Sequence, residues 1–357
     1  MTREPLKSRA NWYGKELDAS GAWIRELNNV HRREIDAALA RVARAPLFSF
    51  AKDDFPIPAT ADLLADIAEE LEDGLGCVRL RGLPVERYSD DEVRQIFWGI
   101  GRHLGTPLYQ NARGEIMGEV RDETKLEQKT FVQSEPGKIV SSRARARSTG
   151  PLRWHTDRCD VIALLCVRNA KAGGISKLTS IVTIYNEILR RRPDLLELLC
   201  QDYWRSRPAD EDGIAPSRAF ALPVFGVQDG KLTCQYSRTY VEQAQEFAEV
   251  PRLSSAQNEA LDLLAEVAEE VCLHSPFVPG DIQLLNNHVI FHGRTAYEDD
   301  SATHQERLLF RLWLSMPNSR RLPEGFDVLW GATGPGALRG GVVQANSERV
   351  AIAGRAA

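Results

Sequence analysis

The feature that most constrains the fold is a series of short β-rich segments in the second half of the chain. From about Gln110 onward, apolar runs alternate with turns, and helical patterns interrupt them at 186–200 and 254–272. Short strands separated by turns predict a sandwich or barrel with helices packed outside. The candidate strands are 160–168, 176–185, 281–285, 288–292 and 307–316.

The first part of the chain carries mainly helical patterns. Apolar residues recur at helical spacing within 23–45, after Thr60 as a possible N-cap, and from Ser89 to Gly105. Between the last two patterns, segment 77–85 alternates apolar and basic residues, as a half-buried strand does.

No linker divides the chain, which we interpret as one α+β domain. We expect an N-terminal helical elaboration over 1–75, a β-rich core with helical insertions over 76–320, and a C-terminal tail over 321–357.

Composition excludes several classes of protein. The formal net charge of -5 argues against nucleic acid as the main partner, because phosphate binding needs a basic surplus. No apolar run is long enough for a transmembrane helix, and the first residues do not resemble a secretory signal. The six cysteines lack CxxC spacing. We therefore expect a cytoplasmic enzyme.

The segment WHTD contains the first candidate site residues, His155 and Asp157. Two positions apart on a strand, the two side chains leave from the same face, where an imidazole and a carboxylate can bind one divalent metal. The alternative is a surface histidine hydrogen-bonded to a nearby aspartate.

A third ligand is available in the segment NNHVIFH. His292 ends a strand pattern far along the chain from His155, and Asn287 could brace its loop. His288 competes for the same role, unless it is a structural histidine. Two histidines and one carboxylate form the facial triad of non-haem Fe(II) oxygenases.

Two arginines lie within the apolar run RLLFRLWL. With a period of two, Arg307, Arg311 and Trp313 share one face of a strand. A buried arginine needs an anionic partner, whereas an exposed strand face would leave both solvated. The two Cα atoms are about 13 Å apart on a strand, which favours two different anions.

A tight turn at Gly173 and Gly174 precedes Ser176, whose hydroxyl could contact a bound oxygen. A molecule with an α-keto acid at one end and a carboxylate at the other would suit this set. It could chelate Fe(II) and anchor its far carboxylate on Arg307 and Ser176.

At these motifs the sequence resembles the Fe(II)/2-oxoglutarate-dependent dioxygenases of the taurine dioxygenase and clavaminate synthase-like family. The resemblance rests on WHTD, GGIS, NNHVIFH and RLLFR, in that order. It implies a double-stranded β-helix (jelly-roll) core. It also implies that His155, Asp157 and His292 bind iron, that Ser176 and Arg307 bind 2-oxoglutarate, and that Arg311 binds substrate. Ser176 replaces the more common threonine, and His288 stands where many members have arginine.

The resemblance further implies an oxidoreductase that uses Fe(II), 2-oxoglutarate and O2 and releases succinate and CO2. The Asp157 carboxylate occupies the position that a halide would need, so we expect hydroxylation, with desaturation or cyclisation as variants. The expected substrate is a small anionic molecule, such as an amino acid or organic acid.

The first part of the chain offers further candidate substrate contacts. Tyr109, Gln110 and Asn111 either line the pocket or form a polar turn. Segment 141–150 is expected to be a mobile basic loop, either solvated or closing over substrate as a lid.

Two other functions remain open. A cupin-type dioxygenase without 2-oxoglutarate would explain the triad but not Arg307. A non-catalytic jelly-roll binding protein would have no need of an intact ligand set. The sequence does not decide whether the chain forms a homo-oligomer.

Overall fold

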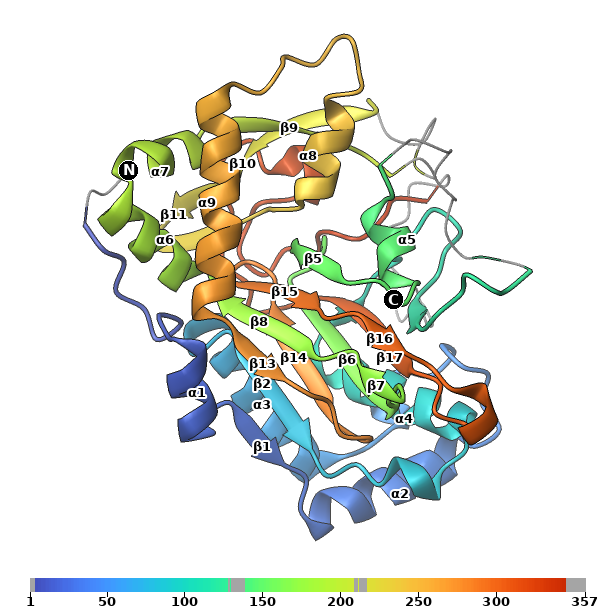
Figure 1. Cartoon of the computed structure of the whole chain (residues 1–357). Helices are drawn as coiled ribbons and strands as arrows, with labels where there is room; N and C mark the ends of the chain where they lie inside the picture. Colours follow the sequence, from blue (N-terminus) through green and yellow to red (C-terminus); the bar gives the residue numbers. More distant parts are fainter. Residues whose placement is uncertain (1–3, 128, 130–138, 209–210, 212–216, 345–357) are drawn as a thin grey trace.

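A computed structural model describes residues 4–127, 129, 139–208, 211 and 217–344 of the chain (Figure 1). The last part of the expected C-terminal tail, residues 345–357, therefore lies outside the described residues.

Helices and strands follow one another along the whole described chain. The α-helices are α1 (Gly14–Ser20), α2 (Asn29–Val42), α3 (Pro58–Asp73), α4 (Asp90–Leu104), α5 (Ser142–Ala146), α6 (Ile181–Arg191), α7 (Pro193–Leu199), α8 (Arg238–Ala244), α9 (Ser255–Val271) and α10 (Asp327–Trp330). The strands are β1 (Ile24–Glu26), β2 (Cys77–Arg81), β3 (Thr106–Pro107), β4 (Met117–Val120), β5 (Leu152–His155), β6 (Val161–Arg168), β7 (Ala172–Gly173), β8 (Ser176–Ser180), β9 (Asp202–Ser206), β10 (Ala219–Pro223), β11 (Phe225–Gln228), β12 (Lys231–Cys234), β13 (Leu273–Ser275), β14 (Ile282–Asn286), β15 (Ile290–Arg294), β16 (Tyr297–Glu298) and β17 (Leu308–Ser315).

Two sheets form the centre of the molecule. The larger has the order β1-β2-β14-β6-β17-β3, with β4 also paired to β17, and the smaller has the order β13-β8-β15-β5. All these pairings are antiparallel except that of β1 with β2. This arrangement agrees with the predicted jelly-roll.

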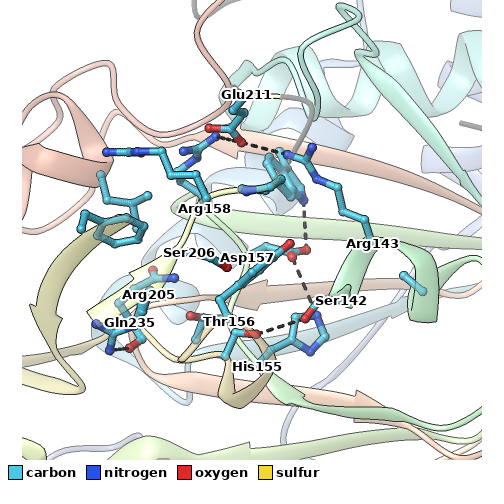
Figure 2. A pocket seen from close by; sticks show the side chains of 18 of the residues that line it. Ser142, Arg143, His155, Thr156, Asp157, Arg158, Arg205, Ser206, Glu211 and Gln235 are labelled. Carbon is cyan, nitrogen blue, oxygen red and sulfur yellow. Dashed lines mark hydrogen bonds and ion pairs between the residues drawn. The ribbon is translucent and has the colours of Figure 1, made fainter. Parts of the chain in front are cut away.

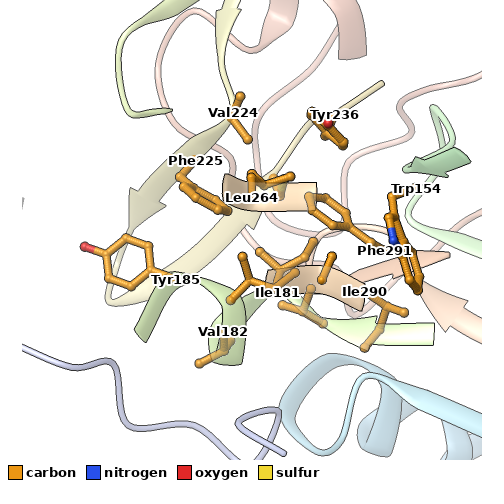
Figure 3. Close-up of a cluster of buried hydrophobic side chains, with 14 of the residues drawn as sticks. Trp154, Ile181, Val182, Tyr185, Val224, Phe225, Tyr236, Leu264, Ile290 and Phe291 are labelled. Atoms are coloured by element: carbon orange, nitrogen blue, oxygen red, sulfur yellow. The ribbon is translucent and has the colours of Figure 1, made fainter. Parts of the chain in front are cut away.

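Helices cover the sheets on the outside (Figure 1). On the larger sheet, Phe310 and its apolar neighbours on β17 pack with Leu64 of α3 and Ile96 of α4. On the smaller sheet, Ile290 and Phe291 join a second apolar cluster with residues of α6 and α9 (Figure 3). Alternate residues of each strand thus face a helical layer and the space between the sheets.

Helix α4 shows how local sequence sets an element. Ser89 caps its N-terminus, and its hydroxyl accepts a hydrogen bond from the Glu92 N–H while Glu92 binds back to Ser89. Gly105 follows the last turn, where a Cβ would lie 2.6 Å from the Ser315 carbonyl oxygen. The prediction for 89–105 is therefore confirmed.

Several predicted boundaries are wrong. The strand predicted over 77–85 ends at Arg81 and is buried on both faces. Contacts elsewhere in the fold explain two further differences. Segment 176–185 is a strand only as far as Ser180, whose hydroxyl then caps α6; the β-branched residues after it are buried on that helix. Thr60 is not the N-cap of α3, which begins at Pro58. The Glu34 carboxylate of α2 accepts the N–H of Thr60 instead.

The prediction of a mobile loop over 141–150 is also wrong in part, since α5 occupies Ser142–Ala146. Arg147, directly after it, is buried and forms ion pairs with Glu115 and Glu123. Charge pairing with residues distant in sequence, which periodicity does not reveal, orders this segment.

The segment after β17 packs back onto the core, where its residue Arg339 binds the buried carboxylate of Asp160. Asp160 accepts hydrogen bonds from His288 Nε2 at 2.8 Å and from Arg339 Nε at 2.7 Å. Burial opposes ionisation of Asp160, but the His288 hydrogen bond and the Arg339 charge lower its pKa.

The division of the chain at 75 and 320 stays a prediction.

Among the described residues, no helix has the length and apolar character needed to cross a membrane. All six cysteines are free.

Replacing Asp160 by alanine should lower the free energy of unfolding by about 3–5 kcal/mol, because Arg339 would keep a buried, unpaired charge. Urea-induced unfolding measures the loss. Glu249→Ala, which removes an exposed partner of Arg218, is the control and should change stability little. Equal stability of the two variants would contradict a structural role for Asp160.

Candidate metal centre

Three predicted ligands meet at the edge of the smaller sheet. Nitrogen atoms of His155 and His292 and a carboxylate oxygen of Asp157 all lie within 4.8 Å of one another. His155 Nε2 is 3.8 Å from Asp157 Oδ1, and His292 Nε2 is 3.9 Å from Asp157 Oδ2. Two imidazoles and one carboxylate at these separations suit a divalent ion such as Fe(II).

Strand pairing brings the two histidines together. His292 on β15 lies directly opposite His155 on β5, and the ring centroids are 4.2 Å apart. Asp157 lies just beyond the end of β5, where Asn287 accepts a hydrogen bond from its backbone N–H at 2.9 Å. Asn287 therefore braces the loop that holds Asp157, whereas the prediction placed it at the loop that holds His292.

The surroundings favour the metal-binding state of each ligand. His155 Nδ1 contacts the Arg153 carbonyl at 2.9 Å, which selects the Nδ1–H tautomer and leaves Nε2 as the ligand atom. Burial, together with the nearby His155, lowers the pKa of His292 to about 3. Its imidazole is therefore neutral at neutral pH.

Two side chains of β17 hold the Asp157 carboxylate. Trp313 Nε1 donates to Oδ2 at 3.0 Å, and Arg311 Nη1 lies 3.8 Å from the same oxygen. Although burial opposes ionisation, the Arg311 charge and the Trp313 hydrogen bond lower the pKa of Asp157. Because β17 places Arg311 and Trp313 on one face, the predicted period of two is confirmed.

His288 is not a ligand in this arrangement. It is fully buried, its Nε2 binds Asp160, and its Nδ1 binds the Thr233 hydroxyl at 2.7 Å. The structural interpretation of His288 is therefore the one that the structure supports.

One cavity runs between the two sheets from the metal centre to a pair of arginines. His155 and His292 line one end, and Ser176, Arg294 and Arg307 line the other. The apolar side chains of Ile162, Leu164 and Leu309 line the cavity as well. A chelating molecule with a distal carboxylate fits this distribution of charge.

Arg307 is buried and lacks a carboxylate partner within the described part of the chain. Its side chain makes a single hydrogen bond there, from Nη1 to the Val120 carbonyl at 3.5 Å. Gly174, in the left-handed region at φ +68°, packs against it, and a Cβ there would lie 3.1 Å from Arg307 Nε. The Gly-Gly turn thus makes room for this guanidinium.

Ser176 lies beside this end of the cavity on β8. Its hydroxyl donates to Gln283 Oε1 at 3.1 Å, and Arg79 donates to the same oxygen at 2.7 Å. Arg79 is itself fully buried, so the floor of the cavity is a packed polar layer.

Arg294 lines the cavity but is not among the predicted site residues. It lies on β15 opposite Ser176, and its Nε and Nη1 make no hydrogen bond within the described residues. The Tyr297 hydroxyl is near enough to favour its charge but does not reach hydrogen-bond geometry. Burial and the nearby Arg307 lower the pKa of Arg294 to about 10. Its position two residues after His292 is the sequence signal that could have identified it.

A second cavity opens on the other side of Asp157 (Figure 2). Its walls come from α5, the end of β5, β9, β10, α8, α10 and β17. The side chains of Ala146, Phe220, Trp313 and Leu329 line it together with several arginines. Arg311 borders both cavities.

The predicted substrate residues Tyr109, Gln110 and Asn111 line neither cavity. Gln110 Oε1 instead accepts a 2.6 Å hydrogen bond from Arg311 Nε, which fixes that guanidinium beside Asp157. Asn111 donates to Glu115 in a turn. A direct contact of the three with substrate stays a prediction.

The sequence matches the model of the taurine catabolism dioxygenase TauD, TfdA family over residues 10–313. The chain belongs to this family. FR-33289 synthase of Streptomyces rubellomurinus is 31% identical over 345 residues, covering 93% of this chain and 96% of the relative.

Solved structures of TauD-like fold agree with the architecture. The asparagine oxygenase complex with Fe(II), 2S,3S-3-hydroxyasparagine and succinate aligns with a TM-score of 0.61 and 16% identity, over 82% of this chain and 93% of that one. The non-heme iron oxygenase OrfP with Fe and alpha-ketoglutaric acid gives a TM-score of 0.58 at 14% identity, over 82% and 94%. The predicted double-stranded β-helix is confirmed.

Alanine at His155, Asp157 or His292 should weaken Fe(II) binding by more than about 100-fold, since each variant removes one of the three predicted ligands. Anaerobic titration against a competing chelator measures the affinity. His274→Ala is the matched control, because His274 belongs to an exposed group with Glu269 and Cys272. A loss of iron in the control alone would place the binding site on the surface.

Proposed function

We propose that this chain is an Fe(II)/2-oxoglutarate-dependent oxygenase that hydroxylates a C–H bond of a small, carboxylate-bearing substrate. In this proposal His155, Asp157 and His292 bind the iron. The observation that carries it is a cavity with metal ligands at one end and two guanidiniums without carboxylate partners, Arg294 and Arg307, at the other.

The polar end of the cavity supports the choice of 2-oxoglutarate. A guanidinium in a buried site is stabilised by a carboxylate that it can bind through two N–H groups. Burial lowers the pKa of Arg307, and an incoming distal carboxylate would offset that cost. Arg294 would provide a second guanidinium that donates hydrogen bonds to the same distal carboxylate.

Bound iron, with 2-oxoglutarate and O2, supplies the oxidising power that such a reaction requires. The chain's own residues orient the ligands and limit access of water. Trp313 and Arg311 hold the Asp157 carboxylate on one side, and the Arg153 carbonyl holds the His155 ring. Ile162 and Leu309 keep the cavity between the sheets apolar.

Substrate would enter the second cavity, on the other side of Asp157, where Arg311 reaches both cavities. The structural neighbours include an oxygenase whose structure contains hydroxyasparagine, which supports an amino acid or similar acid as the substrate class.

Visible absorption tests the proposal directly. Fe(II) added anaerobically to the purified protein, followed by 2-oxoglutarate, should produce a saturable charge-transfer band. Exposure to O2 should then release succinate. If iron binds without a band, a cupin-type dioxygenase becomes the better assignment; if iron does not bind, a binding protein does.

Arg307→Gln and Arg294→Gln should each raise the dissociation constant of 2-oxoglutarate by about 10- to 100-fold, the loss expected for a charge-assisted hydrogen bond. The band titration measures both constants. 2-Oxovalerate, which has the keto acid but no distal carboxylate, should bind the variants and the parent alike. Arg168→Gln, at the exposed end of β6, is the control. Equal losses for both ligands would contradict the assignment of these arginines.

A further inference from the structure

The cavity on the substrate side of Asp157 contains an ion-pair cluster that the reaction chemistry does not explain. Glu211 Oε1 accepts hydrogen bonds from Arg158 Nη2 at 2.9 Å and from Arg143 Nη2 at 3.1 Å. All three residues line the cavity, and Figure 2 shows Glu211 at its far end from His155.

The three side chains of the cluster are largely buried. The side chains of Arg158 and Glu211 are 11% and 5% exposed, and that of Arg143 is 20% exposed. Two guanidinium groups therefore converge on one carboxylate oxygen in a low-dielectric site, where charge-assisted hydrogen bonds are strong. This is the geometry that an oxyanion needs.

Arg158 is placed by backbone contacts as well as by charge. It directly follows Asp157, and its carbonyl accepts a 2.7 Å hydrogen bond from the Gly341 N–H. Gly340, at φ +79°, passes so close that a Cβ would lie 2.7 Å from the same carbonyl oxygen. The segment after β17 thus fixes the backbone of Arg158 directly after Asp157.

The three residues come from separate parts of the chain. Glu211 lies 53 residues from Arg158 and 68 from Arg143 in sequence, so the carboxylate is not tied to the arginines by local structure. A ligand oxyanion could replace it without unfolding β5 or α5. The apolar side chains of Ala146, Phe220 and Leu329 line the same cavity and would contact the body of such a ligand.

We propose that Arg143 and Arg158 form a subsite for the substrate's oxyanion, and that Glu211 occupies this subsite until substrate displaces it. The inference rests on the proposed function and narrows its substrate class to small molecules that combine an oxyanion with an apolar body. Glu211 then competes with the substrate for the two arginines. The apparent affinity for substrate falls as the fraction of protein with Glu211 in the subsite rises.

Calorimetry on the Fe(II)- and 2-oxoglutarate-loaded protein, kept anaerobic, tests the subsite with defined probes. Acetate, methanesulfonate and inorganic phosphate are titrated separately, which distinguishes a planar from a tetrahedral oxyanion. Arg158→Gln and Arg143→Gln should weaken binding of the preferred probe by about 10- to 100-fold. Glu211→Gln should strengthen it by about tenfold, because the competing charge is lost. Arg190→Gln, which removes an exposed partner of Glu187, should leave it unchanged.

Three results would overturn the inference. Undetectable binding of every probe, or equal binding by the parent and both arginine variants, would rule out an oxyanion subsite. Weaker binding of methylammonium to Glu211→Gln than to the parent would instead assign Glu211 to a cationic substrate group. The 2-oxoglutarate band, recorded on the same samples, tests the proposed function separately. Arg158 directly follows Asp157, so Arg158→Gln could also lose iron. Arg143 lies on α5, away from Asp157, and Arg143→Gln then still tests the subsite.

Discussion

The pairing of β15 with its two neighbours is the constraint on which the whole site depends. Against β5 it sets His292 opposite His155, and against β8 it sets Arg294 opposite Ser176. Because strand side chains alternate between faces, a shift of one residue would turn His292 away from its partner. The two registers of β15 thus determine both the predicted metal centre and the arginine end of the cavity between the sheets.

Buried positive charge is the main energetic cost of this arrangement. Arg294, Arg307 and Arg311 all line the cavity between the sheets, and burial lowers the pKa of each. Arg311 is compensated by Asp157, whereas the other two have no carboxylate partner among the described residues. Such a site favours an anionic ligand over water, so the cosubstrate would contribute to stability as well as to chemistry.

The sequence was informative where function depends on short-range patterns. The spacing of His155 and Asp157, the strand-like period of Arg311 and Trp313 and the capped helix after Ser89 could all be predicted. It failed where a distant residue decides the outcome. Glu34 satisfies the first turn of α3, and buried packing turns the β-branched residues after Ser180 into a helix. No local pattern encodes such contacts.

The predicted metal ligands and the lining of the second cavity come from different parts of the chain. The family match ends at residue 313, and the metal ligands and Arg307 all lie within it. Beyond it, Leu329 lines the second cavity, Arg339 binds Asp160, and the Gly341 N–H binds the Arg158 carbonyl. Glu211 comes from a different segment again. Because several parts of the chain outside the metal motifs build this cavity, its selectivity can change while β5 and β15 keep the metal centre constant.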